Sequence, residues 1–218
     1  VLQIIEKEGF VALKQLAELV TASESTVRRD LEFLEEIGQI RRTRGGASYV
    51  GESISALDER FTHSLPQKQA VGRVAAELIQ SGEAVMLDGG TTTLEVARHL
   101  EGKSLQVVTN SLPIVSLLAN QKLVELVMLG GYVYPKSGVA LGPLTIKALS
   151  EIHVRRLFIS VGGITERGLF NSNTLLVDTE RAMLASAEEV IVVTDSSKLG
   201  HSALAHLCPL SRVQRVVV

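Results

Sequence analysis

The stretch “ESTVRRDLEFLEEIG”, Glu24 to Gly38, has the periodicity of an amphipathic helix. Val27 and Leu31 share one helical face and predict that this face is buried. The adjacent Arg28 and Arg29 then point outward. Such a pair suits contact with DNA bases and phosphates, although most charged helix faces are simply solvated. The sequence on either side of the helix is therefore needed to choose between a DNA-binding helix and an ordinary solvated one.

Short predicted elements on both sides complete a helix-turn-helix pattern. Upstream, apolar residues in the range 13–20 recur at helical spacing, and “TAS”, residues 21–23, forms a brief turn. Ser23 is a suitable N-cap, because its hydroxyl can accept a hydrogen bond from a first-turn amide. Downstream, “QIRRTRGGA”, residues 39–47, predicts a hairpin with glycines near its turn. A second helix that enters the major groove, followed by a basic wing, is typical of DNA-binding domains.

The candidate DNA-contacting side chains are concentrated in the second helix and the hairpin. Arginine can bind guanine edges or phosphate, and serine or threonine hydroxyls do so more weakly. The predicted DNA-binding residues are Ser25, Thr26, Arg28, Arg29, Arg41, Arg42 and Arg44. The alternative is a solvated face with ordinary ion pairs, such as Arg28 with Glu32 at i,i+4 spacing. Because the formal net charge of the chain is -2, any positive field must be local.

From Pro66 onward, apolar strands alternate with helices. The predicted strands cover residues 84–87, 105–109, 123–129, 157–161, 189–194 and 215–218. This alternation predicts a mostly parallel sheet with helices on both faces, and 45% hydrophobic residues are enough for its core. The predicted fold class is α/β. We expect a winged helix-turn-helix over residues 1–50, a linker over 51–65 and a larger α/β domain over 66–218.

Polar and glycine-rich segments follow the carboxyl ends of these strands, where ligands bind in parallel α/β sheets. The most informative is “DGGTTT”, residues 88–93, at the start of a predicted helix. Its glycines expose amides, its threonines add hydroxyls and the helix dipole favours an anion, so the segment suits phosphate. For any single glycine pair, a tight turn is the alternative. The candidate ligand-binding residues are Asp88, Gly89, Gly90, Thr91, Thr92, Thr93, Asn110, Gly130, Gly131 and Lys198.

Two sets of motifs resemble one family of bacterial transcriptional regulators, the DeoR family. “SESTVRRDL”, residues 23–31, followed by “IGQIRRTRGGA”, residues 37–47, resembles its winged helix-turn-helix. “DGGTTT”, “TNS” (109–111) and “DSSK” (195–198) resemble its sensor domain, which is related to ribose-5-phosphate isomerase and glucosamine-6-phosphate deaminase. Many relatives have an aspartate where this chain has Gly162.

The resemblance implies a repressor of a carbohydrate-utilisation operon. It implies operator DNA and a phosphorylated sugar or polyol effector as partners, and assembly as a homodimer or homotetramer. It also implies a structural role for Asp30. Because the chain starts in mid-pattern at Val1 and stops inside “VQRVVV”, we expect both ends to be cut, with a turn of the first helix missing.

The competing hypothesis is a sugar-phosphate isomerase or deaminase with an accessory N-terminal domain. Such an enzyme needs a positioned general base. Asp88 and Asp195 follow strands, whereas His201 is the only histidine near a glycine-rich segment. No metal-ligand spacing is recognised, so no catalytic residue, cofactor or metal is predicted.

The location of the protein is predicted from what its sequence lacks. Cys208 is the only cysteine, which excludes an intramolecular disulfide and fits a reducing, cytoplasmic setting. No apolar run approaches the roughly 18 to 20 residues of a membrane span. No signal peptide is visible.

Overall fold

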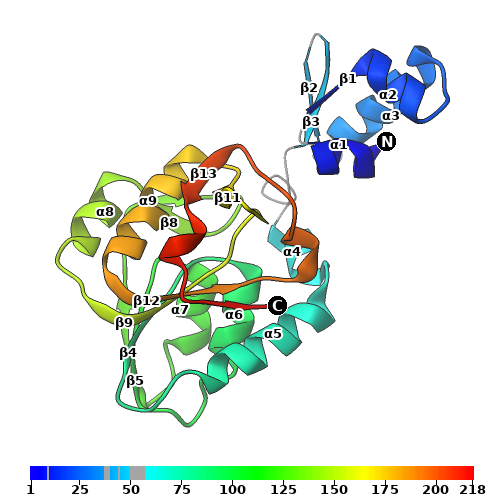
Figure 1. Cartoon of the computed structure of the whole chain (residues 1–218). Helices are drawn as coiled ribbons and strands as arrows, with labels where there is room; N and C mark the ends of the chain where they lie inside the picture. Colours follow the sequence, from blue (N-terminus) through cyan, green and yellow to red (C-terminus); the bar gives the residue numbers. More distant parts are fainter. Residues whose placement is uncertain (9, 37–39, 44, 50–56) are drawn as a thin grey trace.

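The computed structural model describes residues 1–8, 10–36, 40–43, 45–49 and 57–218 (Figure 1). Within these ranges, a small N-terminal domain precedes a larger α/β domain. Gly38, the last residue of the stretch from Glu24, and the predicted DNA contact Arg44 lie outside the described residues.

In the N-terminal domain, short helices pack against an antiparallel sheet with the strand order β1-β3-β2. The helices are α1 (Leu2–Glu8), α2 (Leu13–Leu19) and α3 (Glu24–Glu36). The strands are β1 (Phe10–Ala12), β2 (Ile40–Thr43) and β3 (Gly46–Tyr49). Each of these elements contributes to one buried core of Ile5, Val11, Leu16, Val27, Leu31, Ile40 and Ala47. The predicted helix face and the predicted hairpin are therefore both confirmed.

The backbone of the wing, β2 and β3, lies close to β1 at one position. A Cβ atom on Gly46 would lie 2.2 Å from the carbonyl oxygen of Val11. Any larger residue would force the two strands apart, so glycine is required there for packing.

Parallel strands form the central sheet of the larger domain, in the order β14-β12-β9-β4-β5-β6. They are β4 (Ala84–Leu87), β5 (Leu105–Thr109), β6 (Val124–Met128), β9 (Val154–Ile159), β12 (Ala187–Val193) and β14 (Arg215–Val217). Leu87 pairs with Thr109 on one side and with Phe158 on the other. The carboxyl ends of β4, β5 and β9 therefore meet at one edge, and the predicted parallel sheet is confirmed.

Helices cover both faces of this sheet (Figure 1). One face carries α5 (Leu65–Glu77), α6 (Thr91–Arg98) and α7 (Leu112–Leu118), and the other carries α8 (Pro143–Leu149) and α9 (Thr174–Ala185). Val85 and Leu87 belong to the first core, whereas Met86 belongs to the second. This alternation is the period of two expected for a strand that is buried on both faces.

Short elements, whose bounds the sequence pattern did not predict, lie around the central sheet. They are α4 (Leu57–Thr62), β7 (Tyr132–Tyr134), β8 (Val139–Leu141), β10 (Gly163–Thr165), β11 (Gly168–Asn171), β13 (Ala205–Cys208) and the 3-10 helices η1 (Ser196–Lys198) and η2 (Leu210–Arg212). Segments this short carry too few residues for a periodic signal. Among the described helices, none combines the length and apolarity needed to cross a membrane.

Candidate functional site

The first turn of α3 is built around the hydroxyl of Ser23. The Thr26 amide donates a hydrogen bond to this hydroxyl at 3.2 Å, as expected for an N-cap. The hydroxyls of Ser25 and Thr26 lie 2.8 and 2.9 Å from the same oxygen. These three residues lie at the surface, and two of them are predicted DNA contacts. The amino end of α3 therefore presents a compact group of hydroxyls to solvent.

Arg28 and Arg29 are both exposed on α3. The Arg28 guanidinium lies 3.6 Å from the Glu24 carboxylate, and the two side chains are 64% and 51% exposed. The suggested i,i+4 pair of Arg28 with Glu32 is wrong, because Glu32 binds Arg42 instead. An exposed ion pair contributes only ~0.2–1 kcal/mol, so Arg28 can exchange Glu24 for a phosphate or a base edge at little cost.

Arg42 joins the wing to α3. Its Nη1 donates to Glu32 at 2.8 Å, and its Nε donates to Glu35 at 2.7 Å. The Arg42 backbone amide also donates to Glu35, at 2.9 Å. This backbone bond, together with the guanidinium, lowers the pKa of Glu35, and the Glu35 carboxylate in turn raises the pKa of Arg42. Arg42 was predicted as a DNA contact. In the structure, its ion pairs with Glu32 and Glu35 fix the orientation of the wing relative to α3.

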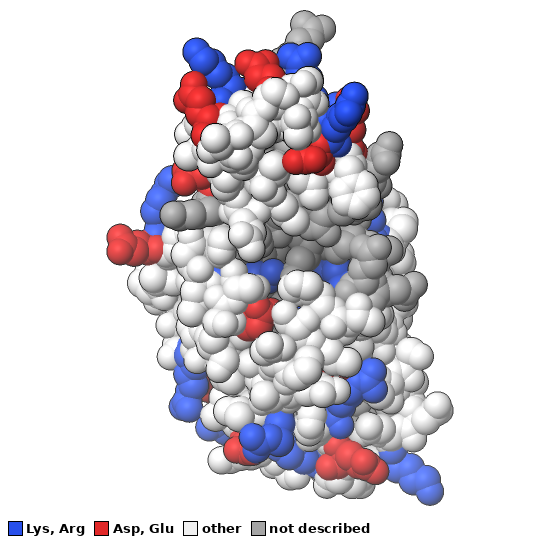
Figure 2. Space-filling model, turned by 90° about the vertical axis from the view of Figure 1, so that its right-hand side faces the viewer, with Lys and Arg blue, Asp and Glu red and all other residues white. Residues whose placement is uncertain are grey.

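Charges of both signs are intermixed on the N-terminal domain. Figure 2 shows Lys or Arg side chains beside Asp or Glu side chains at its upper end, with a mostly uncharged surface below. The face in this view has no continuous basic patch. On this face, the basic side chains of the domain are therefore separated by acidic ones.

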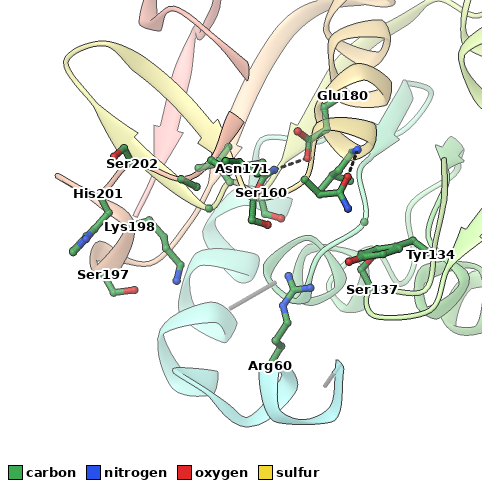
Figure 3. A pocket seen from close by; sticks show the side chains of 18 of the residues that line it. Arg60, Tyr134, Ser137, Ser160, Asn171, Glu180, Ser197, Lys198, His201 and Ser202 are labelled. Carbon is green, nitrogen blue, oxygen red and sulfur yellow. Dashed lines mark hydrogen bonds between the residues drawn. The ribbon is translucent and has the colours of Figure 1, made fainter. Parts of the chain in front are cut away.

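A cavity of about 300 Å³ lies where the carboxyl ends of β4 and β9 meet (Figure 3). Gly89 follows β4 and Ser160 follows β9, and both residues line it. Lys198 of η1, Arg60 of α4 and Glu180 of α9 also line it. In Figure 3, Arg60 extends into the cavity from below, Lys198 lies at the left, and Glu180 lies above, across the cavity from Arg60. The cavity therefore has a cationic side and an acidic side.

The segment after β4 packs tightly against the cavity wall. A Cβ atom on Gly89 would lie 1.9 Å from Val139 Cγ1, and one on Gly90 would lie 2.1 Å from the Ser160 hydroxyl. Gly90 is the N-cap residue of α6, so the amide end of this helix lies beside the cavity. Thr91, Thr92 and Thr93 form the buried first turn of α6. The Thr93 hydroxyl donates to the Gly90 carbonyl at 2.9 Å, which closes the turn internally.

Asp88 and Asn110 are buried at the ends of β4 and β5, with 1% and 0% exposure. Asn110 donates to the Ala140 carbonyl at 3.1 Å. Its own side-chain oxygen and both Asp88 carboxylate oxygens have no hydrogen-bond partner among the described residues. Burial raises the pKa of Asp88 to about 7, against smaller opposing effects of the nearby Gly89 amide and the Arg60 guanidinium.

Glu180 is buried close to Asp88, on the acidic side of the cavity. Its Oε1 accepts a hydrogen bond from the Asn171 side chain at 2.6 Å. Its Oε2 has no partner within the described part of the chain. Burial raises the pKa of Glu180 well above its ordinary value, and the neighbouring Asp88 charge raises this pKa further.

Comparison with known proteins matches both domains. The DeoR-like helix-turn-helix domain matches residues 1–53, and the DeoR C terminal sensor domain matches residues 63–218. The chain belongs to the DeoR family. The HTH-type transcriptional repressor GlcR of Bacillus subtilis is 32% identical over 219 residues, covering 100% of this chain and 85% of that protein. The HTH-type transcriptional regulator UlaR of Escherichia coli is 29% identical, covering 93% of this chain and 81% of that protein.

These relatives are transcriptional regulators, and the isomerase or deaminase alternative is not favoured for this DeoR-family chain. The solved structures share only the fold. The eIF2B delta protein of Chaetomium thermophilum is 17% identical with a TM-score of 0.50, covering 74% of this chain and 57% of that chain. Ribose 5-phosphate isomerase A of Methanocaldococcus jannaschii is 21% identical with a TM-score of 0.45, covering 62% and 54%.

The candidate ligand-binding residues of this DeoR-family protein fall into three groups. Gly89 and Lys198 line the cavity. Asp88, Asn110 and the three threonines of α6 are buried near it, and Gly90 lies with them as the N-cap of α6. Gly130 and Gly131 are not among the described residues that line the cavity, because they follow the edge strand β6. The Gly130 carbonyl instead accepts a hydrogen bond from the Thr145 hydroxyl at 2.8 Å.

Arg60, Asn171 and Glu180 line the cavity and were not predicted as site residues. None of them follows a strand of the parallel sheet, where the sequence search looked for ligand contacts. A signal for Glu180 existed, because it lies three residues from both Val177 and Met183 on the buried face of α9. An acidic side chain on an apolar helix face is rarely buried without a functional or structural partner.

The raised pKa of Asp88 predicts that stability depends on pH. The folded protein binds more protons than the unfolded chain between the ordinary pKa of 3.8 and the folded pKa of about 7. Stability should therefore fall as pH rises through this window. Asp88→Asn should show a smaller loss in melting temperature between about pH 5 and about pH 8, while the exposed Asp178→Asn control keeps the loss of the parent protein. Equal pH profiles for all three proteins would refute this role of Asp88.

Proposed function

We propose that this protein represses a carbohydrate-utilisation operon and releases its operator when a phosphorylated sugar or polyol occupies the cavity. One observation carries the proposal: Arg60, Lys198 and the amide end of α6 border a cavity in a chain that also has a DNA-reading domain. Acting on operator DNA of a bacterial chromosome, the protein would work in the cytoplasm.

On the DNA side, α3 is proposed to enter the major groove with its amino end against the bases. Ser25, Thr26, Arg28 and Arg29 lie in the first two turns of α3, where recognition helices make contacts. The wing, held to α3 by Arg42, would contact the adjacent backbone. A homodimer would place two such helices on half-sites about 34 Å apart, one helical turn of DNA.

On the effector side, the phosphate is proposed to bind between Arg60 and Lys198. Arginine binds phosphate through a planar fork and lysine as a mobile point charge, so the two complement each other. The dipole of α6 adds to their attraction for an anion. The side chains of Ser160, Asn171 and Ser172 supply hydrogen-bonding groups for sugar hydroxyls elsewhere in the lining.

Coupling between the two sites is proposed to run through Arg41 and α4. Arg41 and Ser48 of the wing line the same cavity as Arg60 of α4. A ligand in this cavity would therefore contact both domains, and its affinity would depend on how they are arranged. Only such a difference in affinity between two conformations can shift the equilibrium toward release of DNA.

The test of this function is operator binding with and without ligand. We expect the protein to bind labelled DNA from its own locus, and a subset of sugar phosphates to weaken that binding. Thermal shift with the same compounds should identify the ligand, because a ligand at 100 times its Kd adds about 2.7 kcal/mol to stability. Failure to bind DNA from its own locus under any ligand would refute the proposal.

Lys198→Ala should leave operator binding intact but make it insensitive to effector. Loss of a charged hydrogen bond to phosphate costs about 1.5–3 kcal/mol, so the effector concentration for half-release should rise about tenfold to a hundredfold. Fluorescence anisotropy of labelled operator measures both quantities. The control is Lys122→Ala, which removes an exposed lysine just before the edge strand β6. This variant should respond like the parent protein. Normal release by the Lys198 variant would remove Lys198 from the effector site.

A further inference from the structure

The acidic side of the cavity contains hydrogen-bond acceptors that lack donors. Glu180 and Asp88 are each 1% exposed, and Asn110 is fully buried. Within the described residues, Glu180 Oε2, both Asp88 oxygens and Asn110 Oδ1 have no hydrogen-bond partner. A buried acceptor without a donor costs about 1–3 kcal/mol, and more when it is charged. Of these residues, Glu180 is the one that the structure places among the described residues lining the cavity.

We infer that Glu180 binds a positively charged amino group of the effector, so that the ligand is a phosphorylated amino sugar with a free amine. This inference rests on the proposed function, because it assumes that the cavity is the effector site. It assigns a role to Glu180, which lies on α9 and not in any of the segments that follow the parallel strands.

The charges in the cavity match a ligand of this kind. Arg60 and Lys198 line the cavity and suit a phosphate, while Glu180 lies across the cavity from Arg60 (Figure 3). An ammonium group has three donors, and its charge favours the ionised form of the Glu180 carboxyl, whose pKa burial and Asp88 otherwise raise. A sugar hydroxyl can donate a hydrogen bond but brings no charge that offsets the desolvation of an ionised carboxylate. A ligand with an anionic and a cationic end therefore fits both sides at once.

The surroundings of Glu180 fix its position but leave one oxygen for the ligand. Asn171 holds Oε1, which leaves Oε2 oriented by that bond and without a described partner. The titratable groups that interact with Glu180 include Asp88 at the end of β4 and Cys208 on β13, while Arg60 on α4 interacts with Asp88. Because two neighbouring carboxyls disfavour each other's ionisation, a cation bound beside Glu180 would favour the ionised form of both.

An amine explains this site better than a metal ion. Ca²⁺ takes about six to eight oxygen ligands, several of them usually carboxylates or carbonyls of the protein. Among the described residues, no group of three or more His, Cys, Asp or Glu side chains is placed to hold a metal. One carboxylate oxygen is enough for an ammonium group and is too few for Ca²⁺, whereas hydrated Mg²⁺ beside a phosphate is tested by chelation.

The experiment compares matched pairs of sugar phosphates on the full chain by calorimetry and thermal shift near neutral pH. The pairs are D-glucosamine 6-phosphate with D-glucose 6-phosphate, and D-galactosamine 6-phosphate with D-galactose 6-phosphate. We expect the amino member of at least one pair to bind about tenfold or more tightly than its hydroxyl partner. The preference should weaken as pH falls, because protonation of the carboxyl removes its charge.

Glu180→Gln should reduce this preference to near unity while the hydroxyl member binds as before. Asp178→Asn removes an exposed carboxylate from the same helix and should keep the preference of the parent protein. If the Gln variant does not fold, the pH dependence of the preference in the parent protein decides the question.

The outcomes separate this inference from the proposed function. If the hydroxyl members bind as tightly as the amino members, or if Glu180→Gln keeps the preference, the inference is wrong while the effector site stands. A preference that disappears on addition of EDTA would point to a metal and also overturn it. If no sugar phosphate of either kind binds, the proposed function itself fails.

Discussion

Phe158→Ala should lower the free energy of unfolding of the sensor domain by about 3–5 kcal/mol. The Phe158 side chain is fully buried, in the core between the sheet and α5, α6 and α7. It lies on β9, which has β4 on one side and β12 on the other. Truncation leaves a cavity that neighbours on both strands and helices cannot easily fill, so both the transfer free energy and the cavity add to the cost.

The same substitution should also disturb the effector site. The Phe158 carbonyl accepts a hydrogen bond from the Asp88 amide at 3.0 Å, and the next residue, Gly89, lines the cavity. A shift of the β9 backbone around the lost side chain would therefore displace the cavity wall. Denaturant unfolding followed by circular dichroism measures stability, and thermal shift with effector measures binding. Phe33→Ala is the control, because Phe33 is 60% exposed and its loss should change stability by less than about 0.5 kcal/mol. Similar losses for the two variants would contradict the assigned packing.

Arg28→Ala should weaken operator binding by about 1–3 kcal/mol, or about tenfold to a hundredfold, if Arg28 reads a base edge. Its guanidinium is exposed near the amino end of α3, and its 3.6 Å contact with Glu24 is easily exchanged. Fold stability should hardly change, since the side chain contributes nothing to the core of the domain. Fluorescence anisotropy on operator and on unrelated DNA measures the loss and its sequence dependence.

Arg73→Ala supplies a matched control for this measurement. Arg73 also forms an exposed i,i+4 pair, with Glu77 at 3.2 Å, but on α5 of the sensor domain. It should leave operator affinity unchanged. If Arg28 contacts only phosphate, its loss should instead weaken binding to all sequences and reduce the salt slope by about one. Unchanged affinity at every salt concentration would remove Arg28 from the DNA interface.

Much of the architecture followed from local patterns. The helical spacing of Val27 and Leu31 predicted the buried face of α3, and both side chains are in the core. The apolar runs predicted the parallel strands, because a strand buried on both faces needs apolar residues in succession. Short antiparallel strands such as β10 and β11 escaped prediction, because three or four residues show no period and their pairing is set by distant partners.

The lining of the proposed effector site was predicted only where it depends on strand ends. Gly89 and Lys198 follow β4 and β12, and the topology of a parallel sheet brings such ends together. Gly130 and Gly131 follow a strand in the same way, yet β6 lies at the edge of the sheet, where its end is far from the centre. No local motif specifies the order of strands in a sheet. A prediction from sequence therefore gives the same weight to the end of a central strand and to the end of an edge strand.

The sequence by itself determined the two kinds of domain and the outward arginines of α3, and it predicted an anion site at “DGGTTT”. Each of these depends on residues that are neighbours along the chain or on one helical face. Only the tertiary structure decided that Arg60, Asn171 and Glu180 share a cavity, because they come from α4, β11 and α9. It also decided that Arg42 binds α3, since that ion pair joins residues that the wing must first bring together. Burial of a charge beside distant partners is a property of packing, and it therefore becomes visible only in the folded chain.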